Sequence, residues 1–61
     1  MMSKKEILEE LCSSSEKSAK LLEEICEKVT NQEQKSDLLR IADSIHQQKS
    51  QLEEIKENCN D

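Results

Sequence analysis

The stretch LLRIADSIHQQKSQLEEIKENC, residues 38–59, decides the fold. Its apolar residues recur at steps of three and four, a spacing that places them on one face of a helix. They are Leu38, Ile41, Ile45, Leu52, Ile55 and Cys59. The stretch therefore predicts an amphipathic helix with a single apolar stripe.

A second apolar stripe precedes the first at the same steps. It consists of Leu8, Leu11, Leu22, Ile25 and Val29, and it is interrupted by two serines, Ser15 and Ser18. With Leu8 written as heptad position a, the stripe occupies positions a and d, which is the pattern of a coiled coil. The heptad phase agrees on both sides of the serines, so we expect one continuous helix.

Capping signals predict where the helices begin and end. Ser3 and Glu6 have the spacing of a capping box, so the first helix should cover about residues 3–29 of a single domain. Residues 30–36 contain no apolar side chain, and Asn31 can close a helix in the left-handed conformation. We therefore expect a loop at about 30–36 and a second helix at about 36–58, with a capping box of Thr30 and Glu33 as a rival start.

One long helix is the alternative to a chain that folds back. Val29 and Leu38 are nine residues apart, and about 100° per residue would put the two stripes on opposite sides of a straight helix. Folding back brings them face to face. The predicted fold is therefore all-α, an antiparallel two-helix hairpin of the coiled-coil type that dimerises into a four-helix bundle.

The hairpin implies a core and a register. The core would contain the apolar residues at positions a and d of both helices: Leu8, Leu11, Leu22, Ile25, Val29, Leu38, Ile41, Ile45, Leu52 and Ile55. Ser18 would lie opposite Gln48 and form one polar register layer among apolar layers. Such a layer penalises shifted pairings, provided that Gln48 is largely buried.

Further apolar residues lie beside the two stripes, and small residues accompany them at Cys12, Ala19 and Ala42. We expect a partner edge formed by Ile7, Leu21, Cys26 and Leu39. A homodimer or the helix of another protein would cover it. A chain of 61 residues buries only about 60% of its unfolded surface, which also favours association.

Composition argues against several other classes of function. Fourteen acidic and nine basic residues give a net charge of -5, which disfavours binding to nucleic acid or to an anionic membrane. No apolar run exceeds two residues, so neither a membrane span nor a signal peptide is expected. The expected location is a reducing cytoplasm.

Chemical sites have little support in the sequence. Cys12, Cys26 and Cys59 are odd in number and lack a Cys-x-x-Cys spacing, so they are expected to act as small apolar residues, with a redox thiol as the alternative. The chain has one histidine and no Gly-rich loop. We therefore expect no catalytic residue, no metal, no cofactor and no small-molecule ligand.

His46 is the residue best placed for chemistry, at the outer heptad position b. The run His46 to Lys49 resembles the His-x-x-Lys core of histidine phosphotransfer domains, although Ser50 stands where a Gly is usual. The resemblance implies an exposed histidine that accepts phosphate on a dimeric bundle. A simple surface histidine is the preferred interpretation, and phosphotransfer is the alternative.

The run Leu38 to Ile45 resembles the death-motif helix of pro-apoptotic proteins. Leu38, Ile41 and Ile45 match its apolar anchors, and Ala42 with Asp43 matches its small-Asp pair, but Gln34 occupies the position of a preceding anchor. In size and pattern the hairpin also resembles the two-helix co-chaperones of type III secretion. These resemblances imply a groove on a partner, or a helical partner, as alternatives to self-association.

Overall fold

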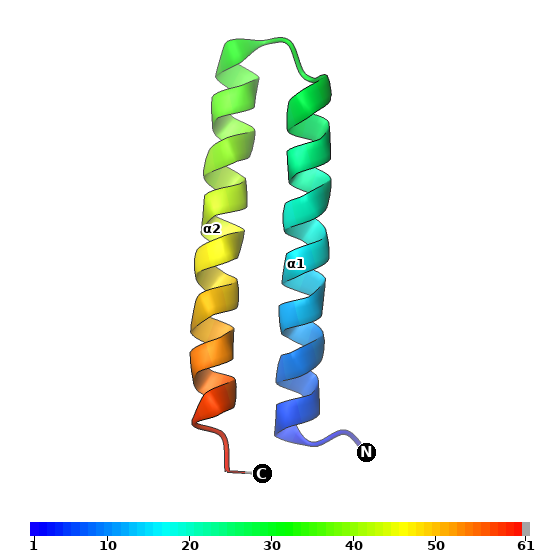
Figure 1. The fold of residues 1–61 in the computed structure, drawn as a ribbon, viewed down its shortest axis with the longest axis vertical. Helices are drawn as coiled ribbons and strands as arrows, with labels where there is room; N and C mark the ends of the chain where they lie inside the picture. Colours follow the sequence, from blue (N-terminus) through cyan, green and yellow to red (C-terminus); the bar gives the residue numbers. More distant parts are fainter. Residues whose placement is uncertain (61) are drawn as a thin grey trace.

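A computed structural model, which describes residues 1–60, has the form of a helical hairpin (Figure 1). Helix α1 covers Lys4–Lys28 and helix α2 covers Gln32–Glu57. The helices run antiparallel and pack against each other, so both chain ends lie at the same end of a particle of 46 × 18 × 11 Å. The all-α two-helix prediction is confirmed, and the single long rod is excluded.

Helix α1 begins where the sequence predicted. The Ser3 hydroxyl accepts a hydrogen bond from the Glu6 backbone N–H at 3.2 Å, and the Glu6 carboxylate accepts one from the Ser3 N–H at 3.4 Å. This reciprocal capping box satisfies two amide groups that the first turn leaves unpaired. The helix then continues without a break through the serine-rich middle.

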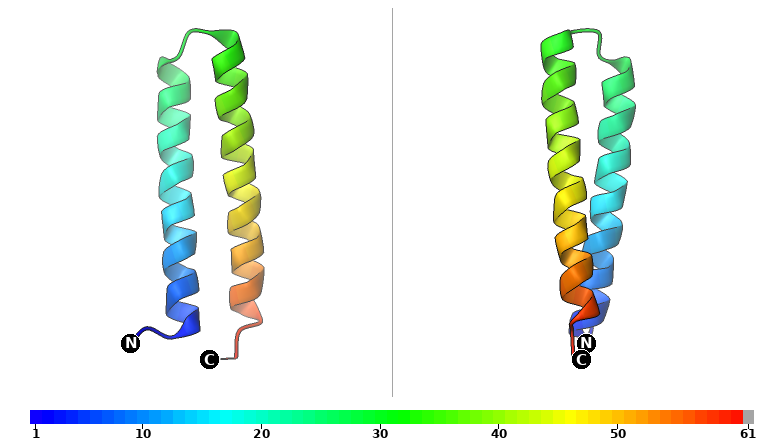
Figure 2. Two further views of the ribbon diagram at one scale, coloured as in Figure 1. Left: turned by 180° about the vertical axis from the view of Figure 1, so that it is seen from behind. Right: turned by 60° about the vertical axis from the view of Figure 1, so that its left-hand side comes forward.

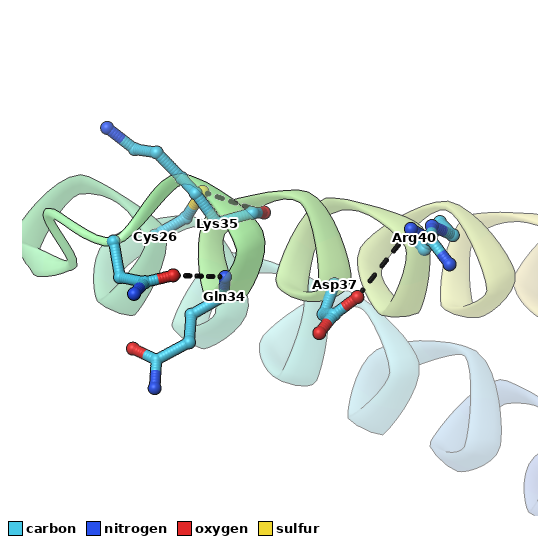
Figure 3. A network of polar contacts seen from close by, with 6 residues as sticks. Cys26, Gln34, Lys35, Asp37 and Arg40 are labelled. Carbon is cyan, nitrogen blue, oxygen red and sulfur yellow. Dashed lines mark hydrogen bonds and ion pairs between the residues drawn. The ribbon is translucent and has the colours of Figure 1, made fainter.

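The turn is shorter than predicted and lies earlier in the chain. Only residues 29–31 separate the helices, whereas the sequence predicted a loop over about 30–36. Asn31 is the reason: its side-chain oxygen accepts a hydrogen bond from Gln34 N–H at 3.0 Å and so caps the start of α2 (dashed line at Gln34 in Figure 3). Asn31 has a φ of -72°, so it does not close α1 in a left-handed conformation.

The two helices lie side by side (Figure 2). Among residues 1–60, the seam between them contains no large, fully buried side chain. We define the seam as heptad positions a and e of both helices. Its buried members are Cys12, Ala19, Cys26 and Ala42, which are 2–8% exposed. Its half-buried members are Leu8, Ser15, Leu22 and Val29 in and just after α1, and Lys35, Leu38, Ile45, Lys49, Leu52, Lys56 and Cys59 in and just after α2.

The structure differs from the predicted core at the d positions. Leu11, Ile25, Ile41 and Ile55 are between 44% and 56% exposed, although the sequence analysis placed them between the helices. The small residues at e explain the difference, because helices approach more closely along a line of Ala and Cys than along a line of Leu and Ile. Each helix is therefore rotated so that e, and not d, joins a in the seam.

The predicted register layer does not form within one hairpin. Ser18 and Gln48 occupy d positions, and both are exposed. Burial of Gln48 was the condition for a polar layer between the helices, and that condition is not met. The pairing of these two helices is set instead by the turn and by the small residues of the seam.

The turn yields a testable prediction. Asn31→Ala should lower the free energy of unfolding by about 1 kcal/mol, because it removes the cap of α2, whereas Asn31→Asp should retain the cap and the stability. Ser36→Ala is the matched control, since Ser36 begins the helix in the sequence prediction but lies inside α2 in the structure. Urea unfolding followed by circular dichroism measures all three. A loss in Ser36→Ala equal to that in Asn31→Ala would contradict the observed turn.

Candidate interaction surface

The hairpin has two broad faces, which differ in chemistry. The two antiparallel helices are related to each other by an approximate two-fold axis, which is perpendicular to the plane that contains both helix axes. Equivalent heptad positions on α1 and α2 therefore face the same side of the hairpin. Position d lies on one side of the seam and position b lies on the other, because successive residues advance by about 100°. One face therefore carries the d residues of both helices, and the opposite face carries the b residues.

The b residues form a polar face with contacts that cross between the helices. His46 Nε2 lies 3.6 Å from Glu23 Oε1, and both residues occupy position b. Lys49 Nζ lies 3.5 Å from Glu16 Oε1 and 3.7 Å from Glu53 Oε1. These contacts agree with the assignment of the b positions of α1 and α2 to a common side.

The d residues form what we call the apolar face. Apart from Lys4 and Gln34 in the first turns of the helices, it consists of Leu11, Ser18 and Ile25 from α1 and Ile41, Gln48 and Ile55 from α2. On each helix the two apolar members enclose one polar residue. The half-buried apolar residues at position a lie in the seam next to this face, so only the d residues of the predicted hairpin core line one side of the hairpin.

The four residues of the predicted partner edge do not share a surface. Ile7 and Leu21 are 47% and 64% exposed and lie on α1 beside the apolar face. Leu39 is 52% exposed but occupies position b, on the opposite face. Cys26 is only 8% exposed because it belongs to the seam. The edge prediction failed at Cys26 and Leu39 because it assumed an a/d seam.

Lysine side chains cover the seam on the side of the polar face. The Lys49 side chain is 27% exposed and reaches two carboxylates from a seam position. Near the turn, the Cys26 thiol lies 3.9 Å from the carbonyl oxygen of Lys35 and points toward it (Figure 3). Long aliphatic stems with charged ends suit such positions, because the stem shields apolar atoms while the ammonium group remains in water.

Figure 3 also shows Asp37 and Arg40, which lie one turn apart on α2, with 3.6 Å between Asp37 Oδ1 and Arg40 Nη2. Both side chains are more than half exposed, at 59% and 80%. Such a pair contributes little to stability, because water screens it. The Asn31 cap therefore stabilises the turn more than this ion pair does.

The two motif resemblances occupy different surroundings. The side chain of His46 is 55% exposed on the polar face, where it faces Glu23. In the death-motif stretch, Ala42 is buried and Leu38 and Ile45 are half-buried in the seam, while Ile41 is exposed. A groove that takes all of these anchors would therefore require the hairpin to open.

The structure offers little else for a ligand. Within residues 1–60, no three His, Cys, Asp or Glu side chains gather in a metal-binding arrangement. A depression near the chain ends is lined by Lys4, Glu54, Ile55, Asn58, Cys59 and Asn60. Neither α1 nor α2 has an apolar stretch that could cross a bilayer.

Comparison with protein-family models, with curated proteins and with solved structures found no match. The apolar face therefore has to be interpreted from its own geometry and chemistry.

The small residues of the seam yield a second prediction. Ala19 is 2% exposed, so Ala19→Leu should force the helices apart and lower the free energy of unfolding by about 1–3 kcal/mol. Ser13→Leu makes the matched change at heptad position f of α1, where Ser13 is exposed, and should leave stability nearly unchanged. Thermal unfolding should separate the two variants by at least about 4 °C. Equal melting temperatures would contradict the a/e seam.

Proposed function

We propose that this chain is a non-catalytic protein-interaction module that pairs with a second copy of itself through the apolar face, to give a four-helix bundle. The observation that carries the proposal is the apolar face itself. Leu11, Ile25, Ile41 and Ile55 remain about half exposed on one side of the hairpin, while the opposite side carries polar contacts between the helices. A surface with this asymmetry is typical of a helix pair that packs against further helices.

The size of the face suits a second hairpin. The broad side of the particle measures 46 by 18 Å, which is roughly 800 Å² in outline and close to what one partner contributes to a standard protein interface. A second copy has the same dimensions and the same apolar stripes. Two hairpins laid face to face would therefore cover each other without leaving part of the stripes exposed.

The hairpin alone exposes more surface than a compact protein of its mass. A folded monomer of 7.1 kDa has about 4,100 Å² of accessible surface, whereas this hairpin exposes 5002 Å². Of the 60 described residues only four are buried, and all are Cys or Ala. Ordering the chain costs about 1.5 kcal/mol of conformational entropy per residue. The free energy gained by burying so few apolar side chains hardly offsets this cost. Association supplies the burial that the seam lacks.

Analytical ultracentrifugation at micromolar concentration tests the proposal. The expected result is a particle with twice the mass of the 7.1 kDa chain. A stable folded monomer at these concentrations would contradict it. A monomer that becomes ordered only with a different helical protein would show instead that the face serves a hetero-partner, as in a two-helix adaptor.

A matched pair of variants tests which face is used. Ile41→Glu and Leu39→Glu change the charge equally and replace residues of α2 with similar exposure, 49% and 52%, on opposite faces. Each buried isoleucine contributes about 1.5–3 kcal/mol, and the dimer contains two copies. Ile41→Glu should therefore weaken association at least about a hundredfold, while Leu39→Glu should leave the dimer intact. Sedimentation equilibrium measures both, and dissociation by Leu39→Glu alone would contradict the assignment.

A further inference from the structure

We infer that the two hairpins pair with their turns at opposite ends, so that α1 packs on α1 of the second copy and α2 packs on α2. This inference rests on the proposed self-association. Two-fold symmetry allows two ways to lay one apolar face on another. With the turns at the same end, α1 would pack on α2 of the other copy. With the turns at opposite ends, each helix meets its own counterpart.

The outer margin of the apolar face distinguishes the two arrangements. On α1, position g carries Ile7 and Leu21, which are 47% and 64% exposed, and alternates with the polar residues Ser14 and Lys28. Each lies four residues before a d residue, Leu11 or Ile25, so it extends the apolar face outward along α1. Helix α1 therefore presents a wider apolar strip than the d positions alone provide.

Position g of α2 is polar throughout, with Asp37, Ser44, Gln51 and Asn58. With the turns at the same end, Ile7 and Leu21 would lie beside this polar row of the other copy. With the turns at opposite ends, the four apolar g residues of the two α1 helices lie along one edge of the bundle, and the polar rows of the two α2 helices lie along the other edge. The distribution of apolar area therefore favours opposite ends.

Charge favours the same arrangement. At the end of the hairpin that holds the chain termini, residues 4–10 and 53–57 contain six glutamates and three lysines. At the turn end, residues 27–40 contain three acidic and three basic residues. Opposite ends separate the two acidic clusters by up to the 46 Å length of the hairpin, far beyond the Debye length of about 8 Å at physiological salt. Turns at the same end would place the clusters together.

The polar residues of the apolar face fit this symmetry. Ser18 is the middle d residue of α1, between Leu11 and Ile25, and Gln48 is the middle d residue of α2, between Ile41 and Ile55. A perpendicular two-fold axis at this height places Ser18 on Ser18 and Gln48 on Gln48 of the second copy. Hydroxyl and amide groups both donate and accept hydrogen bonds, so each can pair with an identical group.

Disulfide trapping tests the inference. The background replaces the native thiols by Cys12→Ala, Cys26→Ala and Cys59→Ser, and sedimentation first measures whether it dimerises. Ser18→Cys and Gln48→Cys are then oxidised in a glutathione redox buffer, separately and as an equimolar mixture, and the linked peptides are identified by mass spectrometry. Ser13→Cys, at the exposed position f of α1, is the matched control.

The expected result is a disulfide dimer in each single variant, formed roughly a hundredfold faster than in Ser13→Cys, because the thiols would be held together within the dimer. If a disulfide forms only in the mixture, between residue 18 of one copy and residue 48 of the other, the inference is overturned while the proposed self-association stands. A dimer with no such link would also overturn it. If sedimentation finds both the background and the unaltered chain to be monomeric, the proposed function itself is refuted.

Discussion

The close contact of small side chains along the seam is the constraint on which the rest of the structure depends. Cys12, Ala19, Cys26 and Ala42 are the only buried residues among those described, and all of them have small side chains. Because these residues occupy heptad position e, the helices are rotated so that the leucines and isoleucines at position d remain outside the seam. The seam thus sets the pairing of α1 and α2 and, by the same rotation, leaves an apolar face uncovered.

This rotation links folding to the proposed function. A hairpin with its larger apolar residues between the helices would be more stable as a monomer and would expose less apolar surface to a partner. Here the d residues that could have filled a core lie at a surface of roughly 800 Å², while polar contacts of Lys49 and His46 with glutamates occupy the opposite side. We therefore interpret the weak core and the apolar face as two consequences of the same helix rotation, and we propose that a second copy completes the core.

The sequence was sufficient for the helices but not for their rotation. Period and capping predicted two antiparallel helices, and the capping box of Ser3 and Glu6 is present in the structure. The turn was misplaced because Asn31 was considered as a helix stop, whereas its side chain caps the next helix. The e positions of the seam were missed because hydrophobicity favours Leu and Ile over Cys and Ala, although the seven-residue spacing of Cys12, Ala19 and Cys26 was visible. Close packing depends on size as well as on hydrophobicity, and a heptad pattern alone does not weigh the two.

Thermal unfolding of the unaltered chain over a range of concentrations tests the central claim most directly, because it asks whether the fold depends on a second copy. Only a protein whose folded state is an oligomer has a melting temperature that depends on its concentration. For a dimer of this size, a hundredfold increase in concentration should raise the melting temperature by about 10 °C. A cooperative transition at the same temperature throughout, from a particle of monomer mass, would contradict the account.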